Sequence, residues 1–307
     1  MIQGRTDLAL ELQEQLEQEQ NMDGIRVEKR LDRKTQIAEI KIYVETKEAS
    51  ERIGKPIGQY ITLESPTFLE EDTSYYEEMS EALFLVLQQF ITEETKVLVV
   101  GLGNEQVTPD ALGPLVVEHL FVTRHLKQHQ FMKQGLDVSA LVPGVMAQTG
   151  METQEILKGV VSQTKPDLVI AIDALSARSS ERLNKTIQIS NTGIAPGSGV
   201  GNHRQELTEE TIGVPVIAIG VPTVISVPAI VKEAIEAICR IIQEMGGNNV
   251  IEHFTEEETL QLASELLAPD FSSMFVTPKN IDEAVNRISF TISEAINRYI
   301  PKIDGIK

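Results

Sequence analysis

Two apolar runs, each leading to an aspartate, dominate the hydrophobic pattern of the chain. The first run, 96–101, continues through a glycine-rich loop to Asp110, and the second, 168–173, ends at Asp173. Runs of this kind are typical of parallel strands buried on both faces. In an open α/β sheet, side chains just beyond the carboxyl ends of strands line the crevice where ligands bind. Asp110 and Asp173 are therefore the first candidates for chemistry.

Around these runs the pattern alternates between the periods of strands and helices. Strands are predicted at 96–101, 137–142, 168–173, 186–190 and 214–220, and helices at 112–125, 153–161 and 228–244. Such alternation indicates parallel strands joined by right-handed crossovers. The predicted fold class is α/β: a three-layer α/β/α sandwich on a mostly parallel, doubly wound sheet.

The flanking segments follow other patterns. Thr6 is suited to cap a helix whose Leu8, Leu12 and Leu16 form one apolar stripe, and its Gln- and Glu-rich face is expected in solvent. Further strands are predicted at 34–45 and 61–64, and further helices at 70–91, 256–267 and 280–299. Because no repeat or low-complexity linker divides the chain, we expect one composite domain over 1–307, with a regulatory or docking segment at 1–20 and an α/β core at 96–245.

Composition narrows the range of partners. The 46 acidic residues against 27 basic ones give a net charge of −19. This argues against nucleic acid, because phosphate binding draws on clustered Lys and Arg. No run approaches the roughly 18 apolar residues that span a bilayer, so no membrane partner is expected. Cys239 is the only cysteine, which excludes an intramolecular disulfide and favours a reducing cytoplasm.

Several loops allow more than one interpretation. Gly101-Leu-Gly-Asn104 suggests either a dinucleotide-binding turn or a plain tight turn, but Val107 stands where the third glycine of the fingerprint belongs. The loop 196–204 either provides backbone donors for an oxyanion or is a plain mobile loop. His203 within it is interpreted as a proton-transfer group, as a ligand or as a solvent-exposed side chain. Three roles are open to Arg178: it lowers the pKa of Asp173, it holds substrate, or it forms a salt bridge.

Two carboxylates at neighbouring strand ends support two kinds of chemistry. If they share a proton, they can activate water and protonate a leaving amine, because close like charges push their pKa values apart. Otherwise they can hold a metal, which usually needs a third ligand such as His. The usual hydrolase motifs, such as His-Glu-x-x-His and Gly-x-Ser-x-Gly, are absent from the sequence.

Longer motifs are spread over most of the chain: Arg5-Thr-Asp-Leu-Ala9, Gly54-Lys-Pro-Ile-Gly58, Tyr60-Ile-Thr-Leu-Glu64, Gly101-Leu-Gly-Asn104, Val107-Thr-Pro-Asp-Ala-Leu-Gly-Pro114, Pro143-Gly-Val-Met-Ala-Gln-Thr-Gly150, Ile172-Asp-Ala-Leu-Ser-Ala-Arg178 and Gly199-Val-Gly-Asn202. Together they resemble the germination proteases of endospore-forming bacteria. The resemblance implies an atypical aspartic endopeptidase that cleaves small acid-soluble spore proteins during germination. It also implies a homotetramer, made as a zymogen, in the cytoplasm of the forespore or spore core.

The same resemblance assigns roles to residues. It implies Asp110 and Asp173 as the catalytic pair, without cofactor or metal. The substrate-binding or supporting candidates are Asn104, Arg178, Asn202 and His203. The family's core resembles that of phosphorylases and hydrogenase maturation proteases, here with added amino-terminal β elements and carboxy-terminal helices. Because the family's removable leader precedes the Arg5–Ala9 motif, any activating cut is expected at or before Arg5.

Two rival functions remain open. Hydrogenase maturation endopeptidases also carry Gly-x-Gly-Asn followed by an acid and a glycine, and there the acid helps to bind nickel. Asp110 and Gly113 occupy the corresponding places, and His203 or His253 would have to supply a third ligand. The second rival is a non-catalytic scaffold or nucleotide-binding module that uses the Gly101 turn.

Overall fold

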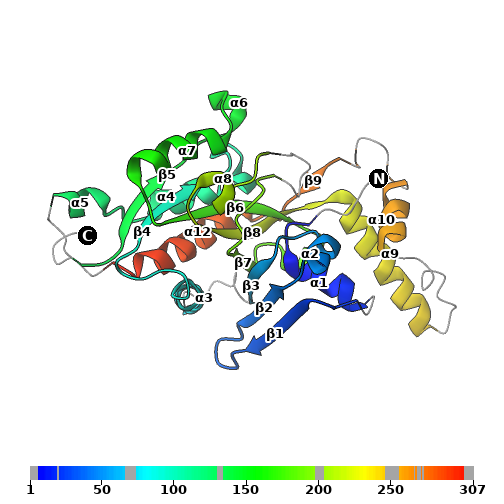
Figure 1. Ribbon diagram of the computed structural model, residues 1–307. Coiled ribbons are helices and arrows are strands. Elements are labelled where there is room, and N and C mark those ends of the chain that lie inside the picture. Colours follow the sequence, from blue (N-terminus) through cyan, green and yellow to red (C-terminus); the bar gives the residue numbers. More distant parts are fainter. Residues whose placement is uncertain are drawn as a thin grey trace.

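The computed structural model describes residues 6–18, 21–65, 74–129, 134–197, 204–245, 256–265, 267, 271 and 273–300. Nine strands within these residues form one sheet, in the order β1-β2-β3-β7-β8-β6-β4-β5, with β9 paired to β8 (Figure 1). The strands are β1 (Ile25–Leu31), β2 (Ala38–Val44), β3 (Gly58–Glu64), β4 (Lys96–Gly101), β5 (Asp137–Leu141), β6 (Leu168–Ala177), β7 (Thr186–Ser190), β8 (Val216–Ser226) and β9 (Phe275–Val276).

Helices cover both faces of this sheet (Figure 1). The described helices are α1 (Ala9–Gln18), α2 (Lys47–Ile53), α3 (Ser74–Leu87), α4 (Leu112–His119), α5 (Arg124–Gln128), α6 (Met146–Thr149), α7 (Thr153–Thr164), α8 (Glu209–Ile212), α9 (Val227–Glu244), α10 (Glu256–Glu265) and α12 (Ile281–Asn297), with 3₁₀ turns η1 (Thr108–Asp110) and η2 (Ser180–Arg182). Among the described helices, none combines the length and the apolar character that a membrane crossing needs.

The three layers follow from the two-residue period of the strands. In β4, Val97 and Val99 join the core cluster with α3, α4 and α12, whereas Leu98 and Val100 join the cluster with α7 and α8. Successive side chains of a strand point to opposite faces, so an apolar run buries both faces only when helices cover both. The predicted α/β/α sandwich is confirmed.

The core strands β8-β6-β4-β5 are parallel, as predicted, but the sheet as a whole is mixed because β1–β3, β7 and β9 add antiparallel pairs. The pairs β4–β5, β4–β6 and β6–β8 are parallel. The pairs β1–β2, β2–β3, β3–β7, β7–β8 and β8–β9 are antiparallel. The segment 178–185 between β6 and β7 is shorter than the dozen or more residues that a parallel crossover needs, so β7 runs back against its neighbours.

Two central strands are longer than predicted. β6 continues beyond Asp173 to Ala177, and β8 continues to Ser226. A bulge between Leu175 and Ser176 lets the pairing of β6 with β8 resume after Pro222. Asp173 therefore lies within a strand, and not in a loop that follows one.

The helix predicted over 112–125 is interrupted by a contact with α12. α4 ends at His119, and Leu120 is extended. The side chain of Asn297 accepts a hydrogen bond from the Phe121 amide at 2.9 Å and donates one to the His119 carbonyl at 3.2 Å. A side chain from a distant helix thus satisfies the backbone groups that are free where α4 stops.

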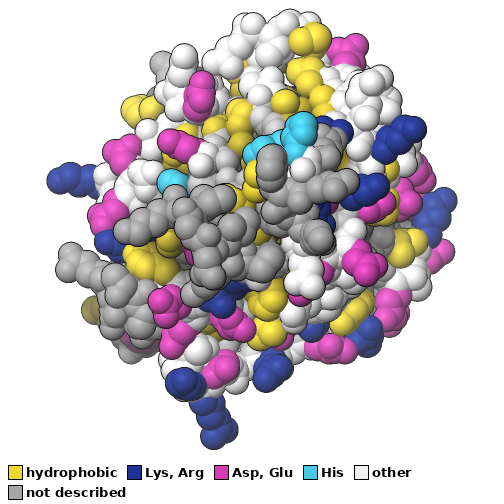
Figure 2. Space-filling model, turned by 90° about the vertical axis from the view of Figure 1, so that its left-hand side faces the viewer, with side chains coloured by type: hydrophobic (Ala, Val, Ile, Leu, Met, Phe, Trp, Pro, Cys, Tyr) yellow, Lys and Arg dark blue, Asp and Glu magenta, His cyan; other side chains and the backbone are white. Residues whose placement is uncertain are grey.

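The surface carries both signs of charge. On the face drawn in Figure 2, acidic and basic side chains are interspersed with scattered hydrophobic ones. The excess of acidic residues seen in the composition is therefore not a single-sign field over this face.

The α1 segment is more buried than its amphipathic pattern predicts. Glu11 is 6% exposed and Gln13 is fully buried, although both belong to the face that we expected in solvent. The Glu11 carboxylate accepts hydrogen bonds from the amides of Arg178 and Ser179 at 2.8 and 3.0 Å, and lies 3.5 Å from the Arg182 guanidinium. The segment therefore holds the chain just beyond β6.

Replacing Glu11 with alanine is expected to destabilise the fold by about 1–3 kcal/mol, because two amides and one guanidinium lose a buried acceptor. Urea denaturation measures the change. Glu48→Ala is the matched control, since Glu48, like Glu11, lies in the first turn of its helix but is exposed. Equal stabilities for the two variants would contradict this role of Glu11.

Candidate active site

Asp173 occupies the middle of the most central parallel strand. Within β6 its side chain is 5% exposed, and its Oδ1 accepts a hydrogen bond from the Ala174 amide at 3.0 Å. In the pairing with β8 it stands opposite Gly220. By the alternation of the strand, its side chain points to the face covered by α7 and α8.

Asp110 reaches the same region through a folded loop after β4. The Leu102 amide donates to the Ile172 carbonyl at 2.8 Å, which ties the loop to the residue before Asp173. The Asn104 amide then donates to the Asp110 carbonyl at 3.0 Å and closes the loop. Gly103 has a φ of +110°, and a Cβ there would stand 2.0 Å from the Asp110 carbonyl oxygen. Only glycine fits at this contact.

The start of α4 approaches β4 equally closely. A Cβ on Gly113 would lie 2.3 Å from the Leu102 carbonyl oxygen and 2.5 Å from its nitrogen. A second set of contacts holds the other side of the loop: the Thr223 hydroxyl donates to the Pro109 carbonyl at 2.7 Å, and the Thr277 hydroxyl donates to the Thr223 carbonyl at 2.8 Å. The backbone that carries Asp110 is therefore fixed by β4, β8 and the residue after β9.

Asp110 and Asp173 line one cavity of about 240 Å³, which we call the pair cavity. Its wall also includes Asp7, Thr153 and Arg204. The two aspartates come from the loop after β4 and from β6, which are adjacent parallel strands. The prediction that they converge on one crevice agrees with this geometry.

Both carboxyl groups are shifted toward the protonated form. Burial raises the pKa of Asp173 well above its usual range, and the charges of Asp110 and Asp7 raise it further. Burial also raises the pKa of Asp110, although the hydrogen bond from the Asn104 amide and the charge of Arg204 lower it. A buried carboxyl group beside a second, partly buried carboxylate favours a state with one proton between the two.

The other site candidates have different placements. Asn104 supports the loop through its amide, and its Oδ1 accepts a hydrogen bond from the Gln106 amide at 3.0 Å. Arg178 is not among the described residues that line the pair cavity. Among the groups that shift the pKa of Asp173, the guanidinium of Arg204 lowers it. Asn202 and His203 lie outside the described residues.

The metal alternative finds no support in the described part of the chain, where His, Cys, Asp and Glu side chains do not gather in threes as a metal site requires. His203 and His253, the possible third ligands, lie outside that part. The carboxylates present do not by themselves make up a fitting ligand set.

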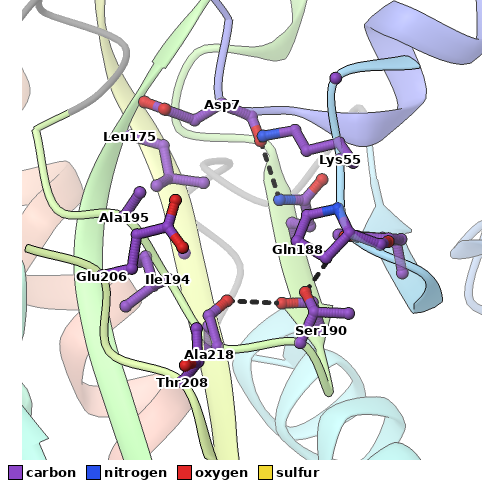
Figure 3. Close-up of a pocket in the computed structure, with 16 residues that line it drawn as sticks. Asp7, Lys55, Leu175, Gln188, Ser190, Ile194, Ala195, Glu206, Thr208 and Ala218 are labelled. Carbon is purple, nitrogen blue, oxygen red and sulfur yellow. Dashed lines mark hydrogen bonds between the residues drawn. The ribbon is translucent and has the colours of Figure 1, made fainter. Parts of the chain in front are cut away.

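A second cavity of about 240 Å³ adjoins the first and shares Asp7 and Leu175 with it; we call it the Lys55 cavity. Figure 3 shows Lys55 and Gln188 approaching Asp7 from one side. The Lys55 ammonium and the Gln188 amide donate to the Asp7 carbonyl at 3.0 and 3.1 Å. Burial lowers the pKa of Lys55, whereas the Asp7 charge raises it.

Sequence reasoning did not single out Asp7, Lys55 or Arg204. Asp7 and Lys55 lie in motifs that carry the resemblance, the Arg5–Ala9 and Gly54–Gly58 motifs, so the motifs were the available signal. Arg204 ends the glycine-rich loop whose histidine drew attention instead.

A family model described as germination protease matches residues 4–249. The chain belongs to the germination protease family. A germination protease of Caldanaerobacter subterraneus subsp. tengcongensis is 46% identical, over 95% of this chain and 93% of the relative. Those of Clostridium perfringens and Bacillus cereus are 41% and 40% identical, over 97% and 95% of this chain and 95% and 92% of the relatives.

The family confirms the resemblance found in the motifs, and a germination protease is a hydrolase. Neither rival function is favoured by these relatives. Among solved structures, the NiFe hydrogenase maturation protease HycI of Thermococcus kodakarensis aligns with 69% of this chain and 99% of its own, at 19% identity and a TM-score of 0.34.

Proposed function

We propose that this germination protease is an aspartic endopeptidase in which Asp110 and Asp173 act together on a water molecule. The observation that carries the proposal is the pair cavity, which both carboxyl groups line: burial raises the pKa of each, and the charge of Asp110 raises that of Asp173 further. Of the two, Asp173 is the more deeply buried, so it is the better holder of the shared proton.

In the proposed reaction, ionised Asp110 takes a proton from water as the water oxygen attacks the peptide carbonyl carbon. Protonated Asp173 donates its proton to the carbonyl oxygen, which gives a neutral tetrahedral diol. The C–N bond then breaks, the leaving nitrogen takes the proton from Asp110, and a diol hydroxyl returns its proton to Asp173. The products are a carboxylic acid and an amine, and both aspartates regain their starting states.

The proposed substrates are the small acid-soluble spore proteins, and the proposed location is the cytoplasm of the forespore and spore core. The family assignment and the resemblance of the motifs support both. We also propose a homotetramer made as a zymogen, and a single composite peptidase domain over 1–307. Support for the single domain comes from the sheet, which joins β1–β3 to the core strands.

Incubation of the purified protein with an acid extract of spores tests the function. We expect discrete cuts in the small acid-soluble proteins, located by intact-mass measurement of the fragments, and none with Asp110→Asn. Intact masses of the enzyme in the same samples report whether residues up to Arg5 are removed. Equal cleavage by the unmodified protein and by Asp110→Asn would refute the aspartate mechanism.

No metal is expected to be needed for cleavage, because the described carboxylates lack a His or Cys partner at ligand spacing. Protein treated with a chelator, and confirmed as metal-free by elemental analysis, should cleave at the untreated rate. Loss of activity that only nickel or zinc restores would instead favour the metal-dependent alternative.

A further inference from the structure

One carboxylate of the pair cavity comes from outside the central strands. Asp7 precedes α1 and lines both the pair cavity and the Lys55 cavity. Figure 3 shows its carboxylate directed away from Lys55, on the side of Leu175. The amino-terminal segment thus provides part of the wall around the aspartate pair.

Hydrogen bonds from several elements fix Asp7 in this place. Its amide donates to the Ser176 carbonyl at 3.2 Å, and its Oδ2 accepts from the Ser176 amide at 3.0 Å. Its carbonyl accepts from Lys55 and Gln188. The next residue, Leu8, is fully buried in a cluster with Leu175. The position of Asp7 is therefore fixed by hydrogen bonds of both its backbone and its side chain.

The bonds to Ser176 fall at the irregular point of β6. The pairing of β6 with β8 shifts register between Leu175 and Ser176, where β8 has one extra residue, and the pairing of β6 with β4 has already ended at Ile172. Asp7 pairs with the backbone there, three residues beyond Asp173. The position of Asp173 along the strand thus depends on a residue 169 positions away from Ser176.

The Asp7 carboxylate also adds negative charge beside Asp173. It is one of the like charges that raise the pKa of Asp173, after burial and Asp110. Removing it lowers this pKa, so Asp173 would lose its proton at a lower pH. Asp110 and Arg204 also act on Asp173. On the other side, Lys55 and Glu206 line the Lys55 cavity with Asp7, and Arg178 acts on Lys55.

We propose that Asp7 is a positioning residue of the aspartate pair: it holds β6 at Ser176 and completes the pair cavity as a third acidic group. Asp7 acts through Asp173 and does not touch the reacting atoms. The inference rests on the proposed function, because it concerns the same pair.

Three variants separate the charge of Asp7 from its hydrogen bond. Asp7→Asn keeps an acceptor for Ser176 but loses the charge, and Asp7→Glu keeps the charge. Asp7→Ala loses both. The matched control is Asp32→Asn, because Asp32 is an exposed carboxylate that also accepts backbone amides, from Lys34 and Thr35. Each variant is assayed for cleavage of spore acid-soluble proteins across pH, with its melting temperature.

We expect the alkaline limb of the pH–rate profile to move to lower pH in Asp7→Asn and to stay in place in Asp7→Glu and Asp32→Asn. Asp7→Ala should lose about 10²-fold in kcat with little change in KM, as a misplaced catalytic group does. A purely structural role would lower the melting temperature without moving the limb.

Two results would overturn the inference. One is an Asp7→Asn profile and rate that coincide with those of the unmodified protein, and the other is a failure of both Asp7→Asn and Asp7→Glu to fold. Asp110→Asn and Asp173→Asn in the same assay distinguish the two proposals. If these are inactive while Asp7→Asn is normal, only the role of Asp7 is wrong; if they are active, the proposed function itself fails.

Discussion

Replacing either member of the aspartate pair with asparagine is expected to abolish proteolysis while the protein stays folded. Asparagine keeps the shape of the side chain but cannot carry out the proton transfers of the proposed mechanism, and such transfers contribute about 10²–10⁴-fold to a rate. The double variant should be little worse than either single one, because the first substitution already disables the unit. Initial rates on purified spore acid-soluble protein measure both effects.

The stability difference between Asp173→Asn and the unmodified protein should change with pH in a definite direction. Because the pKa of Asp173 is raised in the fold, the native state keeps a proton that the unfolded chain loses above about pH 4. The stability of the unmodified protein therefore falls as the pH rises from there through the native pKa. Asparagine does not titrate. Calorimetry at a series of pH values should therefore show that the melting temperature of the variant rises relative to that of the unmodified protein as the pH approaches neutral.

Asp137→Asn serves as the control for the pair. Asp137 begins β5 in the same sheet, at the strand end opposite to the pair cavity. This variant should retain full activity. Near-normal turnover in a well-folded Asp110→Asn or Asp173→Asn would remove the catalytic assignment, and a large fall in melting temperature with surviving activity would indicate a structural role.

Alanine at Gly113 should impair both stability and activity. The added methyl group would lie 2.3 Å from the backbone oxygen of Leu102, and neither backbone can move cheaply. Overpacking of this kind costs about 1–3 kcal/mol. Because Asp110 lies three residues before Gly113, a displacement of α4 by about 1 Å should also lower kcat by about 10²-fold. Urea denaturation and cleavage rates measure the two losses.

Gly159→Ala is the matched control, because Gly159 also lies in a helix, α7, but has no atom within 4 Å of the new methyl group. Here the substitution should stabilise the protein by about 0.5–1 kcal/mol, since alanine favours the helix. If the two glycine variants had the same stability, the close approach of α4 to β4 would not be what determines the site.

The aspartate pair was predictable because its signals are local. The apolar run of β4 matches the predicted strand 96–101. Acidic residues that follow the carboxyl ends of neighbouring parallel strands are expected to meet in one crevice. Asp173 was found by the same rule although it lies inside its strand. The two aspartates line one cavity because β4 ends level with Ile172, so the loop after β4 begins beside Asp173.

The rest of the site depends on contacts that no local pattern encodes. The extension of β6 beyond Asp173 requires β8 as a partner across a bulge. The burial of Glu11 depends on Arg182 and on the amides after β6, so the Gln- and Glu-rich stretch looked like a solvent-exposed face. Asp7 reaches the pair only because the chain before α1 lies along β6, which the sequence pattern does not reveal.

The contact of Thr277 with Thr223 bears on when the protein becomes active during its synthesis. Chains fold as they leave the ribosome, amino-terminal part first. The loop that carries Asp110 is held through Thr223, and the core beside it is filled by α12, which ends at Asn297. A nascent chain that already contains both aspartates thus lacks the last supports of its site. Hydrolytic activity should therefore appear only after residues 277–297 have emerged from the ribosome and packed against the core.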